Sequence, residues 1–84
     1  MSPFSGTIWA KGFSESAFSK ISPGMTKTVV DKIMCAPLSY DCGPDICGSS
    51  YSKQDTPTAD YDRRWIRYDL TEKVIETIRE FYID

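Results

Sequence analysis

The chain has 84 residues, of which 12 are acidic and 10 are basic, so that its formal net charge is -2. This length suits one domain with a single small hydrophobic core. The near balance of charge excludes both the basic excess of a dedicated nucleic-acid binder and the dense acidic surface of a DNA mimic.

The N-terminal part predicts one strand followed by two short helices. Residues 7–13 alternate in the manner of a strand. Ser14 is a suitable N-cap for a helix over 15–21. Apolar residues then recur at helical spacing over 25–36, with Ser22 as the expected cap. A strand is the close alternative for this last segment, because it holds several β-branched residues.

The middle of the chain, residues 37–62, predicts a long irregular loop within a single domain spanning 1–84. It is rich in Pro, Gly, Ser, Asp and Thr and shows no sustained period. Its larger apolar side chains argue against disorder and suit anchors that hold the loop to the core. These residues are Tyr40, Ile46, Tyr51 and Tyr61.

The C-terminal third predicts a strand over 63–70 followed by a helix over 71–83. Alternation along the strand places four side chains on its inward face, namely Arg64, Ile66, Tyr68 and Leu70. Asp69 then resembles a helix cap, and the apolar residues that follow it recur at helical spacing. The expected fold class is therefore α+β: a small antiparallel sheet, with strands near 7–13 and 63–70, packed on the C-terminal helix.

The three cysteines form no recognisable metal motif. Cys35, Cys42 and Cys47 follow a spacing that matches neither zinc nor iron–sulfur sites. A zinc ion would need a carboxylate such as Asp41 or Asp45 as its fourth ligand. A Cys42–Cys47 disulfide would leave one thiol over and would be unusual in a reducing compartment. We expect reduced cysteines that act as small packing residues, with no metal and no other cofactor.

The chain also lacks the usual equipment of an enzyme. It contains no histidine and no asparagine, and its glycines do not form a phosphate-binding loop. We therefore expect a protein without catalytic activity. No stretch approaches the roughly 18 consecutive apolar residues that span a bilayer, and the N-terminus lacks the features of a signal peptide. We expect a cytoplasmic protein without a membrane partner, located in the host cell if a phage encodes it.

The most informative feature is a run in which three of the four arginines alternate with aromatic residues. Arginine, tryptophan and tyrosine often dominate the binding energy of protein interfaces. We predict a partner-binding site made of Tyr61, Arg63, Arg64, Trp65 and Arg67. In one alternative, neighbouring aspartates neutralise these arginines locally. In another the run binds nucleic acid, but the same aspartates would repel phosphates.

These observations favour an inhibitor or adaptor that acts by occupying the surface of a partner protein. Phage-encoded anti-defence proteins such as anti-CRISPRs are an analogy of size and composition alone. We do not expect nucleic acid to be the primary partner. A homodimer that buries Trp9 or Trp65 is a further hypothesis. The alternatives are a nucleic-acid accessory protein and a cysteine-based metal or redox module.

Overall fold

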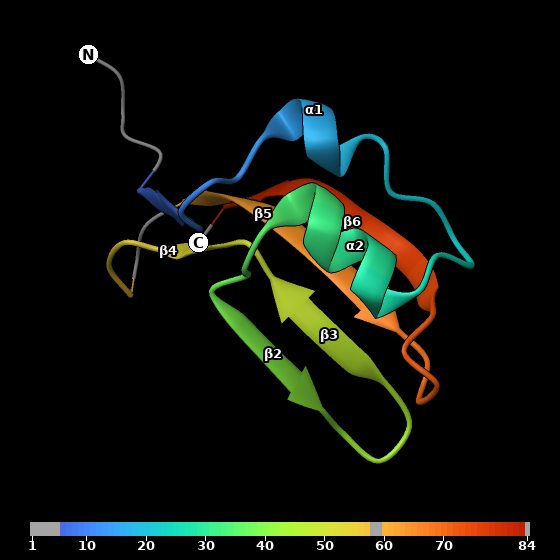
Figure 1. Ribbon diagram of the computed structural model, residues 1–84. Helices are drawn as coiled ribbons and strands as arrows, with labels where there is room; N and C mark the ends of the chain where they lie inside the picture. Colours follow the sequence, from blue (N-terminus) through green and yellow to red (C-terminus); the bar gives the residue numbers. More distant parts are fainter. Residues whose placement is uncertain (1–5, 58–59, 84) are drawn as a thin grey trace.

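The computed structural model describes residues 6–57 and 60–83. The described elements are β1 (Thr7–Trp9), α1 (Glu15–Phe18), α2 (Lys27–Met34), β2 (Ser39–Cys42), β3 (Cys47–Ser50), β4 (Ser52–Gln54), β5 (Tyr61–Tyr68) and β6 (Val74–Tyr82). Four strands form an antiparallel sheet in the order β2-β3-β5-β6, and β1 pairs with β4 in a separate two-stranded sheet. Both helices lie on one side of the four-stranded sheet (Figure 1). None of the described helices is long and apolar enough to cross a membrane.

The strands β3 and β4 act almost as one long strand that follows β5. Only Tyr51 separates them, and its N–H donates to the carbonyl of Arg64 on β5. The Ser52 hydroxyl then replaces a regular backbone contact: it donates to the carbonyl of Asp62 and accepts from the N–H of Arg64. Because both partners lie on β5, these bonds hold the two-stranded sheet at the end of the larger one.

The core lies between the two helices and one face of the sheet. Ile66 and Tyr68 from β5 are fully buried there, together with Val30 from α2. Burying side chains of this size stabilises the fold by roughly 1.5–3 kcal/mol each. The cluster consists of Ala10, Phe18, Ile21, Val30, Met34, Cys47, Tyr51, Ile66, Tyr68 and Val74. We call this side of the sheet the covered face.

Both predicted N-terminal helices are present, with different limits. The hydroxyl of Ser14 accepts a hydrogen bond from the N–H of Ala17, so the predicted cap is confirmed, although α1 is shorter than the predicted range 15–21. The alternative of a strand over 25–36 is wrong. The cap of α2 is Thr26 and not Ser22, because the Thr26 hydroxyl accepts from the N–H of Val29.

The predicted C-terminal helix over 71–83 is wrong, and with it the predicted α+β arrangement, because the segment forms β6 along the whole length of β5. The fold is mostly antiparallel sheet with two short helices. Isolated helical periodicity misled the prediction, since Val74, Thr77 and Ile78 are β-branched and favour strands. Antiparallel pairing with β5 satisfies every second backbone group of β6, an outcome that the local pattern does not reveal.

The predicted helix cap at Asp69 has a different role. One carboxylate oxygen of Asp69 accepts from the N–H groups of Thr71 and Lys73 and from the Thr71 hydroxyl. These hydrogen bonds lower the pKa of Asp69. They close the turn between β5 and β6, and Glu72 adopts a positive φ of 64° within it. An aspartate whose carboxylate accepts from N–H groups a few residues later in the chain occurs both at helix caps and in tight turns. This explains why a helix cap was predicted here.

The predicted irregular loop over 37–62 is also wrong, since it holds β2, β3, β4 and the first residues of β5. Residues 58 and 59 of that range lie outside the described residues. The signal that was missed is the Gly43-Pro44-Asp45 turn, around which Gly43 N–H donates to the carbonyl of Ile46. The strands on either side are short and polar, so they show little of the apolar alternation that identifies a strand.

The two remaining strand predictions are correct in position but shifted in extent. The strand predicted over 7–13 ends at Trp9, and the strand predicted over 63–70 is β5, which spans Tyr61–Tyr68. Leu70, which was expected to face inward, lies in the turn after β5 and is 58% exposed. The inward positions predicted for Ile66 and Tyr68 are confirmed.

One edge of the four-stranded sheet is formed by β6, and the other is formed by β2. At its start, Val74 donates to the carbonyl of Met25 and accepts from the N–H of Gly24. This contact closes the sheet against the segment before α2, where Gly24 adopts a φ of 94°. Beyond Val74, no backbone hydrogen bond from the described residues reaches the outer side of β6.

Candidate binding face

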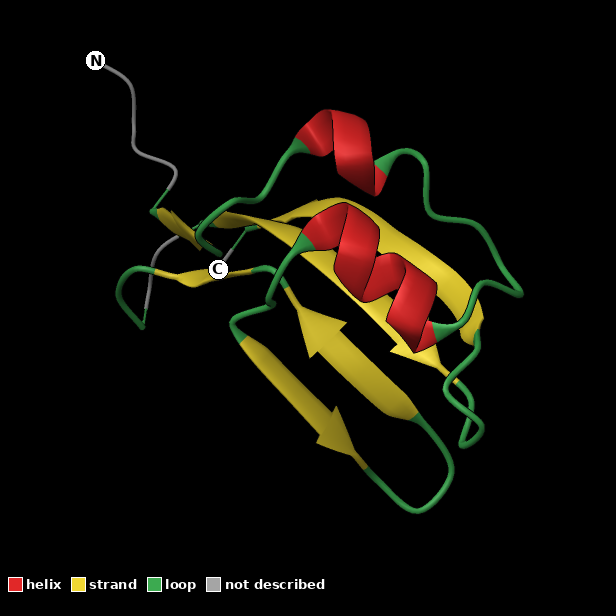
Figure 2. Cartoon of the chain, viewed as in Figure 1, coloured by secondary structure: helices red, strands yellow, loops and turns green. Residues whose placement is uncertain are grey.

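The face of the sheet opposite the helices is uncovered. Ile66 and Tyr68 point to the covered face. The odd-numbered residues of β5, which alternate with them, therefore point to the other side, and so do their cross-strand neighbours. No described helix lies on this side (Figure 2). We call it the open face. Its residues are Ser39, Asp41, Gly48, Ser50, Tyr61, Arg63, Trp65, Arg67, Glu76, Ile78, Glu80 and Tyr82.

Arg63 is held on the open face by three aromatic rings and one carboxylate. Its guanidinium carbon lies 4.1 Å from the ring centre of Tyr82, 4.8 Å from Trp65 and 5.7 Å from Tyr61. Its Nε donates to the Tyr61 hydroxyl at 3.2 Å, and its Nη1 lies 3.1 Å from a carboxylate oxygen of Glu80. Partial burial alone would lower the pKa of Arg63, but Tyr61 and Glu80 raise it. Arg63 therefore joins β5 to β6 and is already well supplied with partners.

Arg67 is the more accessible arginine of this face. It is exposed, and its Nη1 lies 3.6 Å from a carboxylate oxygen of Glu76 on β6. Both side chains are about half exposed, at 46% and 51%, so this ion pair contributes little to stability. The pair draws the guanidinium toward β6, at the outer edge of the sheet.

Arg64 lies on the opposite, covered side. Its Nε is 2.9 Å from one oxygen of Glu15 on α1, and the other Glu15 oxygen lies 2.6 Å from Nε of Arg79 on β6. The Arg64 guanidinium also lies 5.7 Å from the ring centre of Trp9. Partial burial alone would raise the pKa of Glu15, but the two arginines hold it below its ordinary value. This arrangement fastens α1 to the sheet.

The predicted binding residues are therefore divided between two faces. Tyr61, Arg63, Trp65 and Arg67 lie together on the open face, whereas Arg64 does not. Tyr61 is only 7% exposed and supports the Arg63 guanidinium from below. Trp65 is half-buried.

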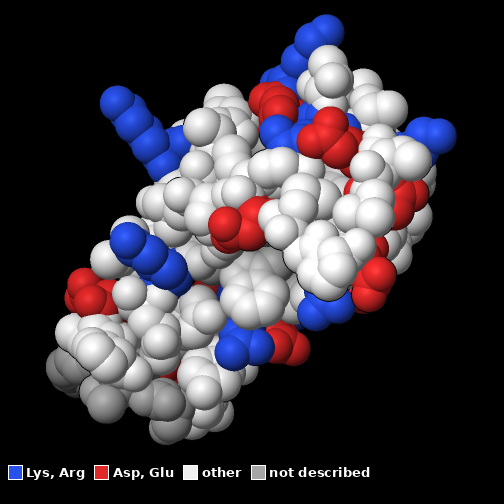
Figure 3. Space-filling view, turned by 90° about the horizontal axis from the view of Figure 1, so that it is seen from below, with Lys and Arg blue, Asp and Glu red and all other residues white. Residues whose placement is uncertain are grey.

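All four arginines of the chain have glutamate partners. The carboxylates belong to Glu15, Glu76 and Glu80, and two of these lie on β6. Sequence reasoning missed them because it placed residues 71–83 in a helix, where they would not lie across from the arginines of β5. The signal that could have found them is the alternation Glu76, Ile78, Glu80, which matches the alternation Arg67, Trp65, Arg63 in antiparallel register. In Figure 3, acidic and basic side chains lie next to one another at several places on the surface, and uncharged surface separates these places.

A shallow hollow of about 360 Å³ lies on the open face beside Trp65 and Arg67. It exists because β3 carries only the small residues Gly48 and Ser50 between Asp41 on β2 and the large side chains of Trp65 and Arg67 on β5. Neighbouring strands are about 4.8 Å apart, so side chains on β2 and β5 face each other across about 10 Å. Its lining consists of Ser39, Asp41, Ile46, Cys47, Gly48, Ser49, Ser50, Trp65, Ile66 and Arg67.

Two polar groups around this hollow lack partners among the described residues. The carboxylate of Asp41 on β2 is exposed and takes part in no described hydrogen bond or ion pair. The indole N–H of Trp65 is buried and has no hydrogen-bond acceptor. The hydroxyl of Ser50, by contrast, donates to the carbonyl of Ser52 at 2.9 Å.

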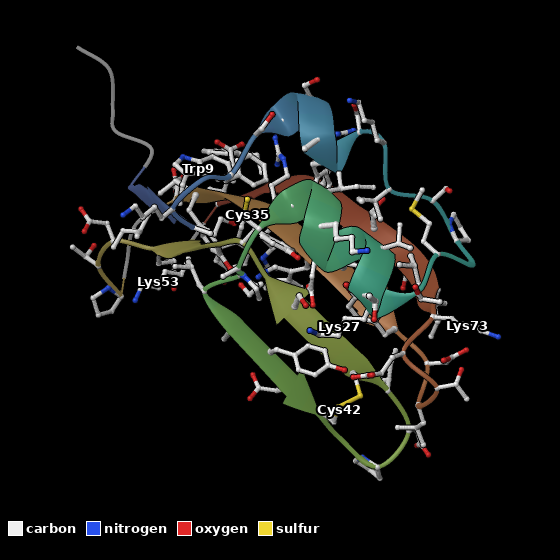
Figure 4. All side chains as sticks on the ribbon, in the orientation of Figure 1. Trp9, Lys27, Cys35, Cys42, Lys53 and Lys73 are labelled. Atoms are coloured by element: carbon white, nitrogen blue, oxygen red, sulfur yellow. A yellow bond between two sulfur atoms is a disulfide. The ribbon has the colours of Figure 1, made fainter. Side chains whose placement is uncertain are left out.

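The expectation of three reduced cysteines is wrong for two of them, because Cys42 and Cys47 form a disulfide (Figure 4). They face each other directly in the β2–β3 hairpin, next to the hydrogen-bonded pair Gly43 and Ile46. Residues at such a position have the closest Cα atoms in an antiparallel pair, which permits a bond between their side chains. Cys35 is free and exposed. Among the described residues no group of three potential ligands is arranged for a metal ion.

The covered face holds a small buried group of polar atoms between α2 and the sheet. The hydroxyls of Ser49, Tyr51 and Tyr68 and one carboxylate oxygen of Asp31 are buried without a hydrogen bond of regular geometry among the described residues. The three hydroxyls nevertheless lie close enough to interact with one another. Burial raises the pKa of Tyr51 to about 12 and that of Tyr68 further. Both hydroxyls are therefore protonated at neutral pH and lie out of reach of solvent.

Comparison of the chain with protein-family models, with curated proteins and with solved structures finds no match.

Proposed function

We propose that this protein has no catalytic activity and binds a partner protein through the open face of its sheet, blocking the surface that it occupies. The observation that carries the proposal is that Trp65 and Arg67 flank a hollow on a face that no described helix covers. A half-buried indole with an arginine beside it is the composition of an interface hot spot. In a sheet that needed only to be stable, one would expect this face to be covered or wholly polar.

The alternative of nucleic-acid binding has less support. Arg63 and Arg67 already pair with Glu80 and Glu76, and a phosphate would have to compete with those carboxylates. Asp41 adds a further negative charge to the same face. Phosphate binding depends on the release of counterions by unpaired basic side chains, which this face does not supply.

We also propose that the protein acts in the cytoplasm and that it is an inhibitor or an adaptor. The analogy with phage-encoded anti-defence proteins still rests on size and composition alone. In a reducing cytoplasm Cys42 and Cys47 would be thiols. The hairpin that they join is also held by its own backbone pairing, so reduction leaves the open face in place. A homodimer that buries Trp65 would use this same face.

The test compares two tryptophan variants in capture experiments on extract of the source cells. Trp65→Ala removes the indole from the open face, and Trp9→Ala is the matched control, because Trp9 is exposed on β1 and outside that face. Proteins retained by the wild type should be retained by Trp9→Ala and lost by Trp65→Ala. Truncating a hot-spot residue costs about 2 kcal/mol or more, so that the affinity should fall at least about 30-fold.

A second open-face variant guards against loss of folding. Ile78→Thr removes apolar surface next to Trp65 but keeps a β-branched residue in β6. Far-ultraviolet circular dichroism establishes that each variant is folded. If folded Trp65→Ala and Ile78→Thr capture the same proteins as the wild type, the proposal is wrong.

A further inference from the structure

We propose that the hollow above Gly48 binds a basic side chain, arginine or lysine, presented by the partner protein. This inference rests on the proposed function and names the chemistry of the partner at that face. It is carried by the charges that the open face leaves unpaired and by the shape of the hollow.

The open face contains two arginines and three carboxylates, and each arginine is paired with a glutamate. The carboxylate of Asp41 is left without a partner among the described residues, and it lines the hollow. A cation placed there would complete the pairing of charges on this face. The chain as a whole carries a charge of -2, which also favours a basic partner.

The two arginines of the open face are held away from Asp41. Glu76 draws the guanidinium of Arg67 toward β6, whereas Asp41 lies on β2 on the opposite side of the hollow. Arg63 is enclosed by aromatic rings and paired with Glu80. Neither arginine therefore neutralises Asp41. A partner carboxylate would have to displace Glu76 from Arg67 and would also be repelled by Asp41.

Trp65 and Arg67 form the wall of the hollow on β5, where Arg67 faces Asp41 across Gly48 and Trp65 faces Ser39 across Ser50. The indole of Trp65 can attract both a guanidinium and the methylene groups of a long basic side chain. Gly48 leaves the floor free for those methylene groups. A volume of about 360 Å³ lies at the lower end of the range of small ligand sites and suffices for one such side chain.

The probe for a direct test is the capped tripeptide acetyl-Gly-Arg-Gly-amide, with the citrulline peptide of the same shape but no charge as its control. Titration is followed in ¹H–¹⁵N NMR spectra of the full chain. With the arginine peptide, the amide signals of Asp41 and Gly48 and the indole N–H signal of Trp65 should shift together and saturate. The citrulline peptide should produce clearly smaller shifts at equal concentration. Equal shifts with both peptides, or shifts scattered over both faces, would overturn the inference.

Two variants locate the site. Asp41→Asn should weaken binding of the arginine peptide about two- to fivefold, the effect of an exposed ion pair. Asp55→Asn makes the same change of net charge at an exposed position outside the open face and should leave binding unchanged. Gly48→Val should abolish binding by filling the hollow. This variant should fold, since a Cβ at Gly48 meets only the Ile66 carbonyl at an ordinary 3.7 Å and valine suits a strand.

The two proposals can fail separately. If the arginine peptide does not bind but partner capture is lost in Trp65→Ala, the basic-side-chain inference is wrong and the protein-binding face stands. If the peptide binds at Gly48 but neither Trp65→Ala nor Ile78→Thr changes capture, the proposed function is wrong. Unchanged peptide binding in Asp41→Asn contradicts the role given to that carboxylate.

Discussion

On the covered face of β5, Ile66 and Tyr68 are fully buried beneath the helices, whereas on the open face Trp65 is half-buried and Arg67 is exposed. The covered face is held by apolar contact, and its two arginines, Arg64 and Arg79, fasten α1 to the sheet through Glu15. The open face is held by ion pairs and ring contacts that lie at the surface. One continuous run of sequence thus supplies both the inside of the fold and the surface offered to a partner, according to the parity of the residue number.

The largest expected difference between the faces is in stability. Ile66→Ala on the covered face should lower the free energy of unfolding by about 2–5 kcal/mol, because it leaves a cavity in a fully buried site. Arg67→Ala, its neighbour on the open face, should change it by no more than about 0.5 kcal/mol. Urea unfolding of both variants measures the contrast. Comparable losses in the two variants would mean that the open face is part of the core after all.

The disulfide lies where the covered face continues beyond α2, and its removal should have the next largest effect. The double variant Cys42→Ser, Cys47→Ala opens a short loop, with a sequence separation of 5 between the cysteines, and should cost about 2 kcal/mol. Thermal unfolding gives the value. Intact mass before and after treatment with a reductant should differ by two hydrogen atoms. An unchanged mass would show that the pair is reduced in the isolated protein.

The ion pairs of Glu15 with Arg64 and Arg79, which we call the α1 clamp, should make the free energy of unfolding modestly dependent on pH. Because Arg64 and Arg79 hold the pKa of Glu15 below its value in the unfolded chain, Glu15 stabilises the fold above that ordinary value. This contribution is lost as the pH falls through the lowered pKa of the folded state. It should be less than about 1 kcal/mol, since Glu15 is half exposed. Glu15→Gln should remove this part of the acid sensitivity in unfolding curves measured between neutral and acidic pH, and an identical pH profile would contradict the clamp.

The smallest effect is expected for the buried hydroxyls of the covered face. Tyr68→Phe should change the free energy of unfolding by less than about 0.5 kcal/mol, because the lost hydroxyl makes no hydrogen bond of regular geometry among the described residues. Tyr40→Phe is the comparison, since the Tyr40 hydroxyl donates to Glu72 at 2.8 Å. Chemical unfolding in urea tests both. A loss above about 1 kcal/mol in Tyr68→Phe would show that the buried hydroxyls bond to one another.

Local features of the fold were predictable from the sequence where the chemistry is local. The cap at Ser14 acts within one helical turn, and the alternation around Ile66 and Tyr68 reports directly which side is buried. The prediction for the C-terminal segment was wrong because its apolar spacing fits a helix and a strand alike. Pairing with β5, its neighbour in the sheet, determines that the segment forms a strand. Such tertiary contacts override a short periodic signal.

The candidate site was predictable only in part for the same reason. Trp65 and Arg67 stand out in the sequence as residues of an interface, and the structure places both beside the hollow. The contribution of Asp41 and Gly48 depends on the pairing of β2 with β3 and of β3 with β5. No local pattern shows which residues that register brings together. Small residues such as Gly48 are informative only once their larger neighbours are known.

The outer edge of β6 has a consequence for how the protein behaves at high concentration. Beyond Val74 this strand offers unpaired backbone groups on a long edge, and Ile75 and Phe81 are exposed along it. Such an edge is a template for the addition of strands from other copies, and charged side chains oppose that growth. On β6 these charged side chains are Glu76, Arg79 and Glu80. If copies of this chain associate at high concentration, the uncovered edge of β6 is where strand addition should begin.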